Sequence, residues 1–464
     1  MGKKTELFAP ILLVGVSALL LSGCPSQDAD QDEADTEAHI ETYAAPARSS
    51  FQYNAIESHS QQFKQQHHEY AAGQLRHQPE GEDNYHTAPF DQQQFIAMVS
   101  LGATTDTLEA LGDSVGLTSP SSETHQTISA IQQQLNSLSS MTIRTGLWGQ
   151  QNYPFSVDYL RQQSLYYAPE LFGVDFVNDP MQADDEIRYW LGNPSGAYTT
   201  DDRSRLVAAQ RSEINATWSA ALTTTQVEGR FAIPEEDEQR WVTMVKIDGN
   251  MDTTEQADYT AVKIPLSDPM LSLQIITPEL EKFESVKNSM DSNFIAALQQ
   301  QYQLQTRTLM LPHFILSQSD WPEGAIDIGI AAMEEQVDLS AVNNYGELYL
   351  LTPQRKIDFK LDNNGIESNT LLSIVHQATE DEQWTLPPST LPPTWSGVIT
   401  TSPANRQPCY YSPDQRPFLF ILYEQQSETV LQIGQVTTLY GENVSPDWYV
   451  RLWQACGTGP ATMD

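Results

Sequence analysis

The first third of the chain carries apolar residues at helical spacing. Phe63 and Tyr70 stand out in the otherwise polar segment 58–72, which predicts a surface helix with a narrow buried stripe. Apolar positions three and four apart recur in residues 95–101, 107–117 and 128–138. We therefore expect three more amphipathic helices before the pattern changes.

Beyond Thr142 the pattern becomes typical of strands. β-Branched and aromatic residues dominate, and the segments 241–245, 259–266 and 273–278 each predict a strand. Two apolar runs at 416–423 and 429–436, joined by a polar turn, predict a hairpin near the end of the chain. Short helices are expected among these strands.

Between these ordered parts lies an unusually long connection, residues 362–417. It opens on Asp362-Asn363-Asn364-Gly365, and its later part contains many prolines that oppose regular structure: Pro387, Pro388, Pro392, Pro393, Pro403, Pro408 and Pro413. A connection of this length inside a compact domain is usually either functional or disordered. Residues 362–417 are therefore the first place to look for function.

The N-terminus has the pattern of an export signal. Lys3 and Lys4 precede an apolar run, residues 7–21, that is too short for a comfortable membrane span. Residues 1–23 are therefore predicted to be a signal peptide.

The residues Leu21-Ser22-Gly23-Cys24 resemble a bacterial lipobox. That resemblance implies a lipoprotein signal peptide and a lipidated Cys24 at the mature N-terminus, with several acyl chains as a stable anchor. Proline at position 25, in place of aspartate, favours the outer membrane. We expect an outer-membrane lipoprotein or cell-surface protein of the bacterial envelope; a plain secretory signal with an incidental cysteine is the alternative.

Residues 24–50 are predicted to be an acidic, disordered tether, because acidic residues come there without a balancing cluster of basic or large apolar ones. The whole chain of 464 residues has a net charge of -37. Such a surface repels polyanions, so a nucleic-acid partner is excluded. The 39% of hydrophobic residues suffices for a large core.

Candidate chemistry is sparse. Five histidines gather in residues 59–86, but their spacing does not fit a zinc helix motif, and we interpret them as solvated. No metal or cofactor is expected, and no Gly-x-Ser-x-Gly motif points to an enzyme. With Cys24 assigned to lipid, Cys409 and Cys456 remain as a candidate disulfide in an oxidising compartment.

Several segments together resemble the serpins, the serine protease inhibitor family. They follow in the family's order: Leu101-Gly102-Ala103, Tyr167-Ala168-Pro169, Val174-Asp175-Phe176, Asn215-Ala216-Thr217-Trp218, Leu311-Pro312-His313-Phe314, and Arg416-Pro417-Phe418-Leu419-Phe420, with Gln435 in place of the family's arginine. The resemblance covers nearly all of residues 55–440. It implies an α+β fold, the serpin fold, in which helices pack around a large mixed central β-sheet with smaller sheets and an exposed reactive loop.

The resemblance also implies a domain plan and a function. The serpin-like domain is expected at 51–443, with the extended reactive loop at 362–417 and a C-terminal tail at 444–464. Serpins act as suicide substrates: a serine protease acylates on the loop, which then inserts as a strand into the central sheet. We expect a monomeric, non-catalytic inhibitor of an exogenous serine protease.

The predicted hinge, Gly365, Ile366, Glu367, Ser368 and Asn369, departs from the family pattern. Isoleucine replaces the usual threonine after the glycine, and the bulky Leu371 and Leu372 stand where the family has small residues. Overpacking is expected there, at about 1–3 kcal/mol for each site.

The sheet beside the hinge is also predicted to be atypical. Arg355 stands where serpins place a histidine that works with an asparagine at the position of Asn215, and Pro353 precedes it in a region expected to be a strand.

Two countings place the reactive bond differently. Counting back from Pro417 gives Arg406 and Gln407. We favour this pair because the specificity pocket of a trypsin-like protease binds arginine. Counting forward from the hinge gives Thr379 and Glu380. Because the loop is about twice the usual length, a non-inhibitory surface protein that binds a partner through its proline-rich loop stays open as the alternative function.

Overall fold

The computed structural model describes residues 36–53, 57–78, 84–118, 120–192, 200–233, 238–279, 281–319, 337–343, 348–351, 353–379, 382, 384 and 416–439. Helices and antiparallel strands are combined in it, which confirms the α+β prediction. None of the described helices is long and apolar enough to cross a membrane.

The central sheet runs in the order β12, β14, β15, β6, β3 and β5, and β13 pairs with β15. Its strands in the described residues are β12 (Phe314–Gln318), β14 (Gln354–Leu361), β15 (Gly365–Ala378), β6 (Ser204–Thr217), β3 (Met141–Gln150), β5 (Glu170–Val174) and β13 (Leu348–Leu350). All of these pairs are antiparallel except β3 with β5. We expected Pro353 to disturb a strand. It lies just before β14, so the strand is not interrupted.

A second sheet runs in the order β11, β8, β9, β10, β16, β17 and β2, with β7 paired to β8. Its strands are β2 (Tyr85–Thr87), β7 (Thr223–Ile233), β8 (Glu238–Glu255), β9 (Tyr259–Pro265), β10 (Leu271–Pro278), β11 (Gln303–Pro312), β16 (Phe418–Glu424) and β17 (Thr429–Val436). The predicted C-terminal hairpin is confirmed as β16 and β17. A short pair joins β1 (Glu37–Ala38) to β4 (Phe155–Ser156).

The described helices include the four that the spacing predicted. Their bounds are α1 (Glu57–Arg76), α2 (Pro89–Ser100), α3 (Thr105–Ser114), α4 (Ser122–Leu135), α5 (Val157–Tyr166), α6 (Pro180–Leu191), α7 (Phe283–Ser289), α8 (Ser292–Gln301) and α10 (Ser340–Asn343). Local signals set the ends of α6. Asp179 caps its first turn, Pro180 starts it, and Gly192 ends it in the left-handed conformation.

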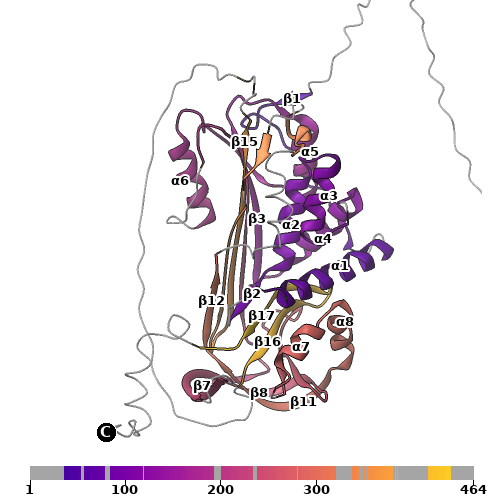
Figure 1. The fold of residues 1–464 in the computed structure, drawn as a ribbon, viewed down its shortest axis with the longest axis vertical. Helices are drawn as coiled ribbons and strands as arrows, with labels where there is room; N and C mark the ends of the chain where they lie inside the picture. The colour runs from indigo at the N-terminus through magenta and orange to yellow at the C-terminus, as the bar shows by residue number, and fades with distance from the viewer. Residues whose placement is uncertain are drawn as a thin grey trace, which may run out of the picture. The chain divides into compact units, whose positions relative to one another are not determined.

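Helices cover both faces of the central sheet (Figure 1). On one face, α2, α3 and α4 pack over the strands and enclose the largest apolar cluster. On the other face lies α6, whose Ala183, Ile187 and Leu191 form a smaller cluster with side chains of the sheet. The central sheet is therefore buried between two helical layers at the level of α6.

Residues 36–50, which were expected to belong to a disordered tether, are packed on the domain. From Thr36 onward the chain packs on the domain: β1 pairs with β4, and the Ile40 side chain is only 2% exposed. Arg48 binds Ser129 of α4, with its Nη2 3.0 Å from the Oγ. Apolar residues within the acidic segment drive this docking, and the acidic composition concealed them.

Three of the five histidines of the N-terminal region, His67, His68 and His86, are not solvated as expected, whereas His77 is exposed. His67 and His68 are each 1% exposed, and His86 is fully buried. His67 Nδ1 lies 2.7 Å from Gln93 Oε1, and its Nε2 accepts from the Val430 amide at 2.9 Å. Burial lowers the pKa of His67 to about 3, so this ring is neutral and serves packing. The described residues contain no cluster of three or more metal-ligating side chains.

Candidate functional site

The start of the long connection forms a strand in the middle of the central sheet. β15 covers the predicted hinge and continues to Ala378. It lies between β14 and β6 and runs antiparallel to both, with Ile366 opposite Leu361 on one side and Ala216 on the other. The predicted loop is thus a central strand over these residues (Figure 1).

One face of β15 suits the core. Ile366, Leu372 and Ile374 are at most 1% exposed and belong to the largest apolar cluster. Between them, Ser368 and Thr370 are buried but polar, and Gln432 Nε2 of β17 lies 3.1 Å from the Ser368 Oγ. Short hydroxyl side chains can therefore enter this interior without losing hydrogen bonds.

The other face of β15 lies partly beneath α6. Glu367, near the start of the strand, is exposed and pairs with Lys360 at 3.0 Å. Farther along, Leu371 and Val375 join the cluster that includes Ile187 of α6.

The overpacking expected at Leu371 and Leu372 does not arise. Successive side chains of a strand point to opposite faces, so the two leucines enter different apolar clusters and do not share one space. Leu371 is 6% exposed and Leu372 is fully buried.

Gly365 occupies a position that no other residue fits. Its φ is +147°, and a Cβ there would lie 2.1 Å from the carbonyl oxygen of Ala216 and 2.6 Å from the Cα of Thr217. Both obstacles are backbone of β6, so they cannot turn away.

Trp218 closes this end of the sheet. Its Nε1 donates to the Asp362 carbonyl at 3.1 Å, and its backbone amide donates to the Asn364 carbonyl at 3.2 Å. The turn before β15 is thereby held against the end of β6.

A buried carboxyl lies under the centre of the sheet. Asp91 of α2 is 3% exposed, and its Oδ1 accepts from Ser212 Oγ at 2.5 Å and from Gln210 Nε2 at 3.0 Å. Burial raises the pKa of Asp91 to about 6, although hydrogen bonds from Ser212, Thr370 and Gln210 act in the opposite direction. Asp91 therefore links α2 to β6 and to the strand between β6 and β14.

Asn215 and Arg355, which stand at the positions of the family's asparagine and histidine, do not lie at the same level of the sheet. Asn215 is exposed, whereas Arg355 is 4% exposed. The buried polar residue at the level of Arg355 is Gln210, because Leu372 of β15 pairs with Arg355 on one side and Gln210 on the other. β6 itself is one continuous strand from Ser204 to Thr217.

Asp91 gives a prediction about pH. A carboxyl with a raised folded-state pKa adds stability that is complete below the unfolded pKa near 4 and is lost as pH rises through about 6. We expect the wild type to lose up to about 3 kcal/mol of unfolding free energy from this group between pH 4 and pH 7. Asp91→Asn removes that loss. Urea unfolding of both proteins across this range measures the difference.

The difference between the two proteins is the proper readout, because buried histidines act in the opposite direction. Burial lowers the pKa of His376 to about 4, so its contribution is present above the unfolded pKa near 6.5 and is lost at lower pH. An Asp91→Asn curve parallel to that of the wild type would show that Asp91 does not titrate as inferred.

The far end of β15 is also tightly bound. Arg203 Nη2 donates to the Ala378 carbonyl at 2.9 Å, and Gln377 Nε2 donates to Asp201 Oδ1 at 2.8 Å. Just beyond the strand, Glu382 pairs with Arg205 of β6 at 2.6 Å, with both side chains less than one tenth exposed. The strand is therefore held at both ends.

The structure brings together only some of the predicted site residues. Thr379 is half-buried directly after β15. Its predicted partner Glu380, the favoured pair Arg406 and Gln407, and the cysteines Cys24, Cys409 and Cys456 lie outside the described residues.

The residues that the sequence did not reveal are Asp91, Gln210, Arg205 and Glu382. A buried carboxyl in a helix and an ion pair across 177 positions have no local signature. Only the alternation of β6, in which Gln210 and Ser212 fall on the same face as Ala208, could have indicated a polar site.

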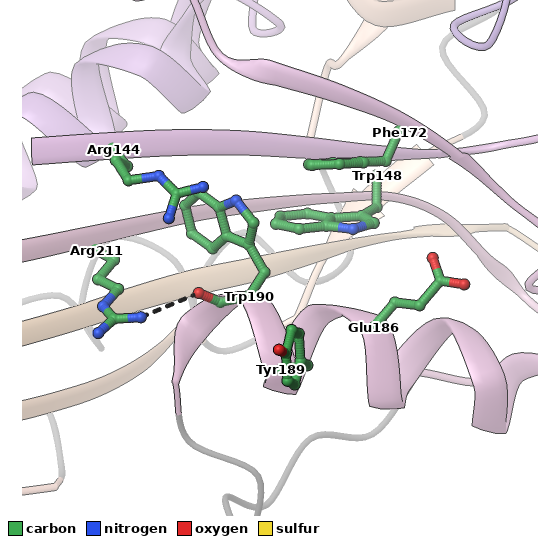
Figure 2. Close-up of a pocket in the computed structure, with 7 residues that line it drawn as sticks. All are labelled: Arg144, Trp148, Phe172, Glu186, Tyr189, Trp190 and Arg211. Atoms are coloured by element: carbon green, nitrogen blue, oxygen red, sulfur yellow. Dashed lines mark hydrogen bonds between the residues drawn. The ribbon is translucent and has the colours of Figure 1, made fainter. Parts of the chain in front are cut away.

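A pocket of about 450 Å³ lies between α6 and the sheet (Figure 2). It is lined by Arg144, Trp148, Phe172, Glu186, Tyr189, Trp190 and Arg211. Trp148 stacks on Phe172 with ring centroids 4.9 Å apart. Arg144 and Arg211 already pair with Glu170 and Glu213, so carboxylates balance the two guanidinium charges.

A family model described as serpin (serine protease inhibitor) matches residues 71–439, which is most of the chain and includes β15 and the C-terminal hairpin. The chain belongs to the serpin family. Sequence relatives agree with this assignment at low identity. An uncharacterized serpin-like protein of Thermococcus kodakarensis is 22% identical over 62% of this chain, and one of Methanosarcina acetivorans is 21% identical over 62%. The serpin described here spans 64% and 66% of the lengths of these relatives.

Solved serpin structures share the fold. Cleaved Serpin 42Da has a TM-score of 0.67 at 17% identity and covers 82% of this serpin and all of its own chain. A loop-inserted cleaved ovalbumin mutant has a TM-score of 0.65 at 15% identity, with 81% and 99% covered. Tengpin in the latent state has a TM-score of 0.61 at 15% identity, with 82% and 98% covered.

Proposed function

We propose that this serpin inhibits serine proteases as a suicide substrate, with residues 365–378 as the part of its loop that enters the central sheet. The observation that carries the proposal is the fit of β15 between β14 and β6: one face is apolar or hydrogen-bonded in the core, and the other packs under α6. Both faces of this segment therefore suit a central strand, as insertion after cleavage requires.

In the proposed reaction the protease's own serine supplies the nucleophile. Its Oγ attacks the carbonyl carbon of the reactive bond, the peptide C–N bond breaks, and the new amino terminus leaves with a proton. An ester then joins the protease to the loop. A strand of 14 residues spans about 48 Å, so insertion of β15 carries the protease along the sheet before the ester is hydrolysed.

The family and its solved structures support this proposal. Cleaved Serpin 42Da and the loop-inserted ovalbumin mutant share the fold of this serpin, in which β15 is a central strand. Cys24, if lipidated, would hold the inhibitor at the bacterial envelope, where it would meet exogenous proteases. Incorporation of labelled palmitate that is lost in Cys24→Ala tests this location, and equal labelling of both proteins would refute it.

The proposed function is tested by incubating the full chain with trypsin-, chymotrypsin- and subtilisin-like proteases. Denaturing gels should show a complex that survives SDS, with loss of protease activity in proportion. If every protease cuts the loop and stays fully active, inhibition is refuted.

A specific observation favours a second function, that of a non-inhibitory serpin with an inserted loop. β15 is in the sheet although the chain is uncleaved, and 39 residues separate Ala378 from Phe418. Such a length spans up to about 130 Å, enough for β15 to insert without a cut. Tengpin in the latent state is a structural neighbour of this serpin. Absence of complexes together with a melting temperature unchanged by loop cleavage would support this function.

A further inference from the structure

The chain makes a buried contact with the start of β6 after β15 has ended. Glu382 lies four residues beyond Ala378, and both of its carboxylate oxygens accept from Arg205. The Arg205 and Glu382 side chains are 8% and 7% exposed. Arg205 also donates to the carbonyls of Asp202 and Ser204, so backbone at the start of β6 orients its guanidinium independently of Glu382.

Trp384 completes this contact from the same segment. Its ring lies 5.2 Å from the Arg205 guanidinium carbon and meets the Tyr153 ring edge-on, also at 5.2 Å. Tyr153 in turn accepts a hydrogen bond from Asn343 Nδ2 at 2.6 Å. Burial, and then the Glu382 carboxylate, raise the pKa of Tyr153. The phenol therefore stays neutral beside the ion pair.

We propose that Glu382 and Trp384 form a latch that holds the inserted strand at the base of the sheet. The proposal rests on the proposed function only for its consequence in inhibition. Both residues bind Arg205 of β6. Glu382 forms the ion pair, and Trp384 covers the guanidinium with its ring. A buried two-oxygen ion pair covered by an aromatic ring resists exchange with water more than an exposed pair does.

The latch decides which bond can serve in inhibition. The pair Thr379 and Glu380 lies between β15 and the latch, so a cut there would separate the strand from the groups that hold it. A cut C-terminal to Trp384 leaves strand and latch in one fragment with the ester. Productive acylation therefore takes place C-terminal to Trp384, which rejects Thr379 as the acylated residue. The latch does not favour Arg406, because 21 residues separate Arg406 from Trp384 and insertion would not pull a protease held by so long a tether along the sheet.

The latch is tested by the melting temperature of the full chain, measured before and after its loop is cut, because the proposed function inserts β15 only after the cut. Glu382→Gln leaves the Arg205 charge buried and unpaired, and a fall of about 5 °C is expected. The matched control is Glu170→Gln, which removes an ion pair with Arg144 in the same sheet whose side chains are 43% and 45% exposed. A change of about 1 °C or less is expected for the control.

The double variant Arg205→Met with Glu382→Leu shows whether the two groups act as a pair. Because the double variant leaves no unpaired buried charge, its melting temperature should lie above that of Arg205→Met alone and above that of Glu382→Leu alone. Equal effects of Glu382→Gln and Glu170→Gln would overturn the latch, as would additive effects of the two changes in the double variant.

The second arm identifies the acylated residue by mass spectrometry of any protease complex that forms. We expect the fragment joined to the protease to end beyond Trp384, and a fragment that ends at Thr379 would overturn the proposal. If no protease forms a complex while Glu382→Gln still melts low, the proposed function fails and the latch stands.

Discussion

Gly365→Ala is expected to reduce the fraction of protease trapped by about 30-fold or more, while the loop is still cut. The new Cβ would lie 2.1 Å from the backbone oxygen of Ala216, and the φ of +147° is unfavourable for alanine. Strain of this kind costs about 2–3 kcal/mol, and each 1.4 kcal/mol slows a step tenfold. Strand insertion would then be slower than hydrolysis of the ester, and the protease would be released. The ratio of SDS-resistant complex to cleaved inhibitor measures this change.

Asn364→Ala is the matched control for Gly365→Ala. Asn364 is exposed in the same turn, and Trp218 binds only its backbone carbonyl. The control should trap protease as well as the wild type does. Equal trapping by Gly365→Ala and the control would show that the first pairs of β15 with β6 are not needed.

Leu372→Arg is expected to abolish trapping. Leu372 is fully buried and pairs in register with Arg355, which is itself buried, so a second guanidinium would enter the core beside a like charge. An unpaired buried charge costs several kcal/mol. The inhibitor should still fold, because the loop is outside the sheet before cleavage in an inhibitory cycle. We expect normal cleavage, no SDS-resistant complex, and no rise in melting temperature after the cut.

Glu213→Arg is the control for Leu372→Arg. Glu213 lies on the exposed face of the neighbouring strand β6 and pairs with Arg211, so an arginine introduced there affects only a surface ion pair. Trapping by this variant should equal that of the wild type. Trapping by Leu372→Arg at the same level would mean that Leu372 does not enter the core.

The elements with strong apolar periodicity could be predicted from the sequence. The burial of polar residues could not, because it depends on tertiary contacts. The helix at 57–76 and the hairpin of β16 and β17 follow from apolar spacing alone. The order of short motifs also led correctly to the serpin family. The burial of His67 and His68 did not follow, because their partners Gln93 and Glu428 lie far away in the chain.

At the candidate site, the glycine was predictable and its surroundings were not. A glycine after Asp362-Asn363-Asn364 signals a turn, and the structure shows why only glycine fits. The compatibility of Leu371 and Leu372 required knowing that α6 covers one face of β15 and α2 the other. The ion pair of Arg205 with Glu382 joins two segments that meet only when β15 lies in the sheet.

Hydrogen exchange of the amides at 366–377, measured on the full chain before and after loop cleavage, tests the central claim most directly. If strand insertion drives inhibition, these amides should exchange quickly before the cut and about 1,000-fold more slowly after it, since β15 then bonds to β14 and β6. Exchange that is the same before and after cleavage, whether fast or slow, would contradict insertion as the inhibitory step.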